Sequence, residues 1–130
     1  MINAEDLTFS KIALIADDVS SARKLYSKVI GELGYEIKTA VNGREALSKI
    51  KSIQPDLVIL DIGMPELDGI EVLKRSQTLS PKTRFLVITA HKDRETVMAA
   101  AREGIVSYLM KPVNLHDLRK RVISADEKIL

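Results

Sequence analysis

Cysteine is absent from this 130-residue sequence, which excludes disulfide frameworks, thiolate nucleophiles and cysteine-based zinc sites. The only two histidines, His91 and His116, do not have metal-ligand spacing. Apolar runs such as Ile12–Ala16 and Leu57–Leu60 are far shorter than the roughly 20 residues of a membrane-spanning helix. Residues 1–10 lack the basic-then-apolar layout of a signal peptide, so we expect a cytoplasmic protein.

A strong charge of either sign is also missing. Lys and Arg number 20 against 18 Asp and Glu, which gives a net charge of +2. Bulk charge therefore favours neither nucleic acid nor a membrane surface as a partner, and we expect direct contact with neither. The length suits one domain that buries its own apolar core.

Short apolar runs of strand length alternate with amphipathic segments along the chain. The five predicted strands are Ile12–Ala16, Tyr35–Ala40, Leu57–Leu60, Phe85–Ile88 and Ile105–Met110. The first predicted helix has apolar residues at three-and-four spacing and ends before Gly34, a residue suited to a left-handed cap. Capping side chains predict the other four helix starts: Asn42, Asp68, Asp93 and Asn114.

Five strands that alternate with five helices predict an α/β fold with a parallel sheet and helices on both faces. The first, third and fourth strands are continuously apolar, as central strands buried on both faces should be. The second strand alternates polar and apolar residues, and the fifth contains Ser107, so both suit the edges. This pattern favours a flavodoxin-like doubly wound (βα)5 sandwich with strand order 2-1-3-4-5.

Polar side chains follow the strands at their carboxyl ends, where doubly wound sheets bind ligands. Asp17 and Asp18 follow the first strand, and Asp61 follows the third; Thr89 and Lys111 follow the fourth and fifth. Because the first and third strands are neighbours in the predicted order, three carboxylates converge there and repel one another unless a cation compensates. Oxygen ligands of this kind suit Mg²⁺, with Mn²⁺ as an alternative, and not zinc.

Four stretches resemble the response-regulator receiver domains of two-component signalling: KIALIADD, LVILDIGMPELDG, FLVITA and SYLMKP. They occur in the family's order, from about Lys11 to the end of the chain. The resemblance implies that residues 11–130 form a receiver domain and that residues 1–10 are an N-terminal extension. It also implies a signalling switch that catalyses its own phosphorylation and dephosphorylation, without independent substrate turnover.

The resemblance further implies that Asp61 is the phosphoacceptor. Asp18 would bind Mg²⁺ directly, Asp17 would bind it through water, and the backbone carbonyl of Gly63 would complete the protein ligands. Phosphoryl transfer is catalysed mainly by positioning and by positive charge on the transferred group, which a divalent ion and a lysine supply.

For the remaining strand ends, the resemblance implies a switch. Thr89 would bond one phosphoryl oxygen, and Lys111 would pair with another. Tyr108 would then turn inward and change the surface formed by the fourth helix, fifth strand and fifth helix. The Lys111–Pro112 peptide bond is expected to be cis. Gly63 and His91 occupy positions that influence the rate of phosphoryl loss in the family.

Each of these residues also has an ordinary structural interpretation. Asp17 and Asp18 could cap the first helix, Thr89 could be a plain strand residue, and Lys111 could be a solvated lysine. Tyr108 could be an edge-strand core aromatic. The joint occurrence of acids, a hydroxyl and an ammonium at four strand ends favours the functional interpretation.

Rival functions fit less well. A magnesium-dependent phosphatase of the haloacid-dehalogenase type needs a second Asp two residues after the nucleophile, where this chain has Gly63. A flavodoxin-like cofactor site would place phosphate against Asp17 and Asp18, which repel it. A receiver-shaped domain that signals without phosphate would not need the complete set of functional side chains.

Within the receiver interpretation, the chain is a stand-alone regulator or relay carrier, or a fragment of a larger regulator or hybrid histidine kinase. The expected phosphodonor is a sensor histidine kinase or a histidine phosphotransfer protein. The exposed flank of the last predicted helix mixes three basic residues with two acids: Arg119, Lys120, Arg121, Asp117 and Glu127. Such mixed charge favours transient, salt-sensitive contacts. We therefore expect a monomer that gains association or partner binding on phosphorylation.

Overall fold

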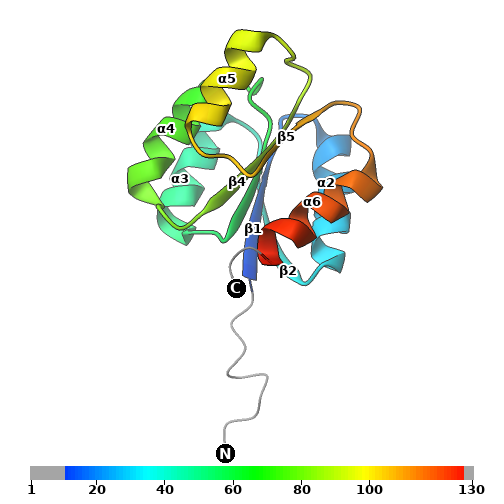
Figure 1. The fold of residues 1–130 in the computed structure, drawn as a ribbon. Helices are drawn as coiled ribbons and strands as arrows, with labels where there is room; N and C mark the ends of the chain where they lie inside the picture. Colours follow the sequence, from blue (N-terminus) through cyan, green and yellow to red (C-terminus); the bar gives the residue numbers. More distant parts are fainter. Residues whose placement is uncertain (1–10, 128–130) are drawn as a thin grey trace, which may run out of the picture.

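The fold is a five-stranded parallel sheet covered by helices on both faces, in a computed structural model that describes residues 11–127. The strand order is β2-β1-β3-β4-β5, which confirms the predicted order (Figure 1). The strands are β1 (Lys11–Ala16), β2 (Tyr35–Ala40), β3 (Leu57–Leu60), β4 (Arg84–Thr89) and β5 (Ser107–Met110).

Two strands differ from their predicted bounds in ways that matter for the site. Thr89 pairs with Met110 and is therefore the last residue of β4 instead of the first residue after it. The fifth strand begins at Ser107 and not at Ile105, because Gly104 turns the chain with a positive φ of 73° just before it. The ladder with β4 starts only after this turn.

The five helices are α2 (Ser20–Glu32), α3 (Gly43–Ile53), α4 (Gly69–Leu79), α5 (Arg94–Arg102) and α6 (Leu115–Glu127). All four predicted capping residues accept a hydrogen bond from a backbone amide of the first turn: Asn42, Asp68, Asp93 and Asn114. The N-cap of α2 is Val19, which has no side-chain cap bond, so the structure does not support the alternative interpretation in which Asp17 or Asp18 caps this helix.

Two apolar cores lie on opposite faces of the sheet. Helices α3, α4 and α5 cover one face, and α2 and α6 cover the other (Figure 1). Alternate residues of the central strands supply the two cores: Leu14 and Val58 pack on the first face, and Ile15 and Ile59 on the second. Because both faces are buried, the central strands are continuously apolar. No helix within residues 11–127 has the length and apolar character needed to cross a bilayer.

The predicted apolar stripe of α6 packs on the sheet. Leu118, Val122 and Ala125 are buried, and Leu115 packs against the same cluster; Ile129, the last member of the stripe, lies outside the described residues. Of the basic run on this helix, Arg119 forms an ion pair with Glu32 of α2 at 3.1 Å. Arg119 therefore faces α2, in an ion pair that is exposed to solvent.

A polar cluster fixes the end of α6 to the amino-terminal edge of the sheet. The Tyr35 hydroxyl donates a hydrogen bond to Asp126, and the Arg84 guanidinium lies 3.2 Å from the same carboxylate oxygen. Lys11 lies 3.7 Å from the other oxygen. Burial and the hydrogen bond to Asp126 raise the pKa of Tyr35 well above its ordinary value. The phenol therefore keeps its proton in the folded protein at a pH where the unfolded chain loses it.

Replacing Tyr35 with phenylalanine is expected to lower the free energy of unfolding by about 1 kcal/mol at pH 8, because Asp126 keeps its two cations but loses one hydrogen bond. A raised folded-state pKa contributes stability that is complete below about pH 10 and is lost as pH rises toward the folded-state pKa. The difference between wild type and Tyr35→Phe should therefore shrink by about 1 kcal/mol between pH 8 and pH 11 in urea unfolding. A difference that stays constant over this range would contradict the assignment.

Candidate functional site

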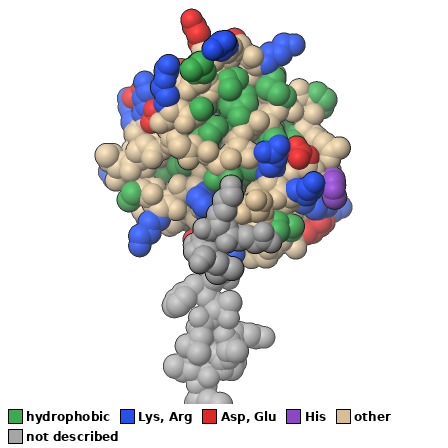
Figure 2. All heavy atoms as spheres, viewed as in Figure 1, with side chains coloured by type: hydrophobic (Ala, Val, Ile, Leu, Met, Phe, Trp, Pro, Cys, Tyr) green, Lys and Arg blue, Asp and Glu red, His purple; other side chains and the backbone are tan. Residues whose placement is uncertain are grey.

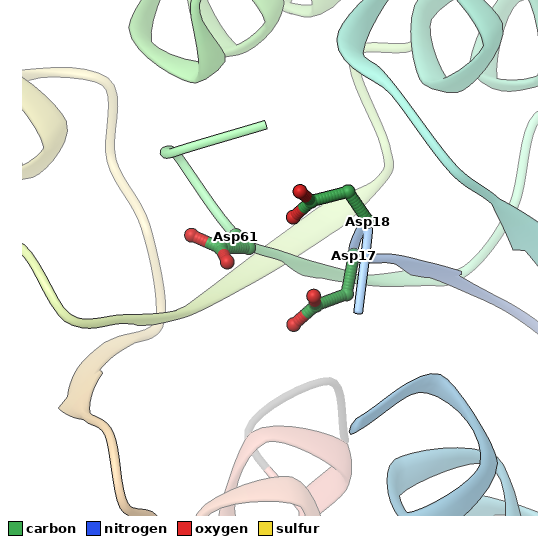
Figure 3. Close-up of side chains that lie close together, drawn as sticks. All are labelled: Asp17, Asp18 and Asp61. Carbon is green, nitrogen blue, oxygen red and sulfur yellow. The ribbon is translucent and has the colours of Figure 1, made fainter. Parts of the chain in front are cut away.

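Three carboxylates meet at the carboxyl ends of β1 and β3. Asp17 and Asp18 follow β1, Asp61 follows β3, and carboxylate oxygens of the three lie within 4.8 Å of one another (Figure 3). Asp17 and Asp61 are 2% and 8% exposed, whereas Asp18 is exposed to solvent. The neighbouring positions of β1 and β3 in the sheet bring these acids together across more than 40 residues of sequence.

Lys111 extends into this acidic group from the end of β5. Its ammonium lies 2.8 Å from Oδ2 of Asp17 and 2.9 Å from Oδ2 of Asp61. Burial alone would lower the pKa of Lys111, but the hydrogen bonds to both carboxylates and their charges outweigh burial and raise this pKa. Lys111 is therefore a permanent cation between the two buried acids. The Lys111–Pro112 peptide bond is cis, as the resemblance implied.

Each buried carboxylate has a backbone partner for its second oxygen. Oδ1 of Asp17 accepts a hydrogen bond from the Val19 amide, and Oδ1 of Asp61 accepts one from the Gly63 amide, both at 2.9 Å. The Asp18 carboxylate has no hydrogen bond or ion pair to residues in the described part of the chain. Asp18 is thus the acid of the group whose oxygens are available to an external ligand.

The donor set fits a hard divalent cation. It consists of carboxylate oxygens alone, it is open to water on the side of Asp18, and Lys111 balances only part of its negative charge. Such a set suits Mg²⁺ or Mn²⁺, which prefer oxygen ligands and retain several waters. Asp17, Asp18 and Asp61 are the residues that could hold the ion.

Thr89 and Tyr108 are connected through the backbone of His91. Thr89 is completely buried, and its hydroxyl oxygen accepts a hydrogen bond from the His91 amide at 3.4 Å. The hydroxyl of Tyr108 donates to the His91 carbonyl at 2.5 Å. Tyr108 itself is half-buried and packs against the core beneath α3, α4 and α5, and burial raises its pKa. The backbone of His91 thus contacts both side chains.

Two features of the site were not apparent from the sequence pattern. The imidazole of His91 lies against Gly63, where an added Cβ would come within 3.0 Å of Nε2. The only signal for this contact was the position of each residue, two places after Asp61 and Thr89. Beside Lys111, a cavity of about 380 Å³ opens toward α2 and is lined in part by Val19, Leu25 and Val113. These apolar residues lie in loops and in α2, and none of them belongs to a functional motif of the sequence.

Comparison with known proteins decides the family. The model of the response regulator receiver domain matches residues 13–123. The chain belongs to this family. It is 34% identical to the chemotaxis protein CheY of Thermotoga maritima over 92% of this chain and 97% of that protein.

The receiver domain is also similar to part of longer proteins and to solved structures. It is 39% identical to the regulatory protein AtoC of Escherichia coli over 81% of this chain, which spans only 23% of the length of AtoC. A CheX-CheY-BeF3-Mg²⁺ complex from Borrelia burgdorferi matches with a TM-score of 0.84 and 29% identity, over 93% of this chain and 92% of that one.

Membership of the family defines the general role of this chain. Receiver domains act in two-component signalling, are phosphorylated on an aspartate and carry an acidic pocket that binds Mg²⁺. They interact with histidine kinases and phosphotransfer proteins, and they are signalling modules and not enzymes that turn over separate substrates.

Proposed function

We propose that this receiver domain accepts a phosphoryl group on Asp61 from a phosphohistidine donor. The observation that carries the proposal is the environment of Asp61: its carboxylate is paired with Lys111 and adjoins Asp17 and Asp18, yet its side chain remains 10% exposed. The side chain of Asp17 has the same lysine partner but is only 2% exposed. Asp61 therefore has both a neighbouring lysine, whose positive charge can stabilise the transferred phosphoryl group, and an exposed edge that a donor can reach.

The transfer exchanges one bond for another. A carboxylate oxygen of Asp61 attacks phosphorus, so an O–P bond forms and the P–N bond of the phosphohistidine breaks. The imidazole nitrogen of the donor keeps the electron pair and leaves as neutral or protonated histidine. Lys111 places positive charge beside the receiving carboxylate, where charge accumulates on the phosphoryl oxygens. Hydrolysis of the acyl phosphate by water regenerates Asp61.

Asp18 is proposed as a direct ligand of Mg²⁺ or Mn²⁺, Asp17 as a ligand through water, and Asp61 and the Gly63 carbonyl as further ligands. Bound Mg²⁺ would neutralise charge on the transferred phosphoryl group. The hydrogen bond from the Gly63 amide orients the Asp61 carboxylate before the donor arrives. The imidazole of His91 lies against Gly63, and we propose that it restricts the approach of water to Asp61 and so prolongs the phosphorylated state.

The proposed switch starts at Thr89. When the Thr89 side chain moves to donate its hydroxyl to a phosphoryl oxygen, its long contact with the His91 amide changes, and with it the position of the His91 carbonyl that accepts from Tyr108. Tyr108 then turns inward, and the surface of α5, β5 and α6 changes. Met98, Met110 and Ile123 on these three elements are 42%, 37% and 45% exposed. Figure 2 shows hydrophobic side chains gathered on this face, between α5 and the segment from β5 to α6.

The phosphodonor is proposed to dock beside α2. The cavity lined by Val19, Leu25 and Val113 adjoins Lys111 and gives an apolar surface next to the phosphoacceptor. Val19 and Leu25 are 47% and 44% exposed and line the same cavity, so together they offer apolar surface to a partner. A helix that carries the phosphohistidine of a sensor kinase or phosphotransfer protein fits such a surface.

Labelling from a phosphohistidine donor in the presence of Mg²⁺ tests the function, and the variant Asp18→Ala tests the metal site. At a Mg²⁺ concentration about five times Kd, wild type should gain about 1 kcal/mol of stability, measured as a rise in Tm. Asp18→Ala should lose most of this gain and should label more slowly. The exposed control Glu36→Gln on β2 should keep both. An Asp18→Ala protein that keeps the full Mg²⁺ gain would show that Asp18 is not a ligand.

The oligomeric state is proposed to depend on phosphorylation. We expect a monomer in the unphosphorylated state, and association or partner binding through the face of α5, β5 and α6 after phosphorylation. Sedimentation velocity with and without beryllofluoride, at two salt concentrations, measures this. Helix α6 carries the charged residues Lys120 and Arg121 close in sequence to the exposed Ile123, so higher salt should weaken the association. A tight dimer that responds to neither variable would contradict the switch surface.

Residues 11–130 are proposed as the receiver domain and residues 1–10 as an extension of it. Because the chain spans nearly all of one CheY but 23% of AtoC, it is consistent both with a stand-alone regulator and with a receiver from a larger protein. Its output partner is therefore another protein or a further domain.

A further inference from the structure

A groove of about 690 Å³ lies between α3 and α4, which are neighbours on one face of the sheet (Figure 1). It is separate from the carboxylates of the phosphorylation site and from the face of α5, β5 and α6. Apart from one serine, its lining consists of three leucines and three cations: Leu47, Leu67, Leu79, Arg44, Lys51 and Arg75.

Two of the three leucines of this groove do not contribute to either apolar core. Leu47 and Leu79 belong to neither buried cluster and are not among the side chains packed against them. Both are only half-buried, so each leaves apolar surface in the groove. Leu67 contacts the core beneath α3 and α4 and adds a third apolar side chain. An apolar strip between two helices is the feature that a third helix can cover.

The charge along the groove is of one sign. No carboxylate lines it, and Arg44 and Arg75 pair with Glu66 and Glu71 at 3.6 and 3.0 Å only in exposed ion pairs at its rim. Lys51 has no acidic side chain within 4.0 Å among residues 11–126. Exposed ion pairs of this kind contribute little and exchange readily with a competing carboxylate. The groove therefore favours an acidic occupant.

The walls of the groove are fixed at both ends. Gln54 closes α3 in a left-handed conformation, and its side-chain amide donates to the carbonyls of Lys51 and Leu79 at 2.9 and 2.7 Å. At the other end the Gly43 amide donates to the Pro65 carbonyl at 3.1 Å. A groove held open in this way costs little free energy to prepare for binding.

We propose that the groove between α3 and α4 binds an acidic amphipathic helix of a partner protein. Apolar side chains at three-and-four spacing would lie against the leucines, and flanking Asp or Glu residues would pair with Arg44, Lys51 and Arg75. The groove has no aromatic side chain on which a base could stack, which disfavours single-stranded nucleic acid. The proposal does not rest on phosphorylation of Asp61.

The occupant would also contact the loop between Asp61 and α4. Leu67 lies between Asp61 and α4 and lines both this groove and the cavity of about 460 Å³ beside Gly63 and His91. If phosphorylation changes the affinity of the groove for its helix, the helix must change the phosphorylation equilibrium by the same factor. In that case, binding of the helix in the groove would be a second input that changes the extent of phosphorylation of Asp61.

Fluorescence anisotropy of a labelled acidic helical peptide tests the proposal on the full chain. The probe is about 15 residues long, with leucines at three-and-four spacing flanked by glutamates, and should bind with a Kd on the order of 10–100 µM. Leu47→Asn and Lys51→Glu should each weaken binding about fivefold to tenfold while Tm stays near that of wild type. The control Lys24→Glu, an exposed charge reversal on α2, should change Kd less than twofold.

Four results would overturn the proposal. They are no saturable binding of the acidic peptide, equal binding of a peptide with lysines in place of its glutamates, binding insensitive to both groove variants, and preferential binding of a single-stranded oligonucleotide. A full-chain variant with Glu5→Lys and Asp6→Lys adds a further check. If it raises peptide affinity more than tenfold, the acidic amino-terminal residues of this chain compete for the groove, and the occupant is not a partner protein.

Discussion

Replacing Asp61 with asparagine is expected to reduce phosphoryl labelling by a factor on the order of 100 or more, because an amide oxygen is a poor nucleophile toward phosphorus. The substitution keeps the size of the side chain and leaves Lys111 paired with Asp17. It also removes one of three converging negative charges, so the folded protein should be at least as stable as wild type without Mg²⁺. Loss of labelling would then reflect chemistry and not unfolding.

The matched control is Asp68→Asn. Asp68 follows Asp61 in the same loop and caps α4 by accepting the Ile70 amide, a role that asparagine also performs. Its labelling should equal that of wild type within a factor of two. The measurement is incorporation of phosphate from acetyl phosphate or a phosphohistidine donor with Mg²⁺. Undiminished labelling of Asp61→Asn would exclude Asp61 as the acceptor.

Replacing Gly43 with alanine is expected to destabilise the protein by about 3 kcal/mol, because the new methyl group has no room. A Cβ at this position would lie 2.1 Å from the carbonyl oxygen of Leu67, a backbone atom that no side-chain rotation can move. The start of α3 or the loop after Asp61 must therefore shift. The hydrogen bond from the Gly43 amide to the Pro65 carbonyl would be strained by the same movement.

Gly31→Ala is the control for this effect. A Cβ at Gly31 meets only Ile37 at 3.6 Å, an ordinary van der Waals contact, within the helix α2. Alanine is a better helix former than glycine, so this variant should gain about 0.5 to 1 kcal/mol. Urea unfolding of both variants measures the difference. A Gly43→Ala protein as stable as wild type would mean that the loop after Asp61 moves away from α3 at little cost.

The sequence by itself predicted the elements and their order. Apolar continuity in Leu57–Leu60 and alternation in Tyr35–Ala40 distinguish a strand buried on both faces from an edge strand, because burial acts directly on residue choice. Capping residues such as Asn42 mark helix starts for an equally local reason, since an exposed amide needs a nearby acceptor. The candidate residues of the site follow from the strand ends, because parallel strands place these ends at one edge.

Only the tertiary structure decided which contacts those residues make. Three contacts depend on distances between segments remote in sequence: Lys111 bridges Asp17 and Asp61, His91 lies against Gly63, and the backbone at Gly43 lies too close to Leu67 to admit a side chain. The same holds for Arg119, which the sequence placed on an exposed flank and the structure pairs with Glu32. Local sequence patterns indicate which residues are buried and which cap a helix, because burial and capping depend mainly on residues of the same helix or strand. Side-chain partners across elements are set by the packing of helices on the sheet, which no single segment encodes.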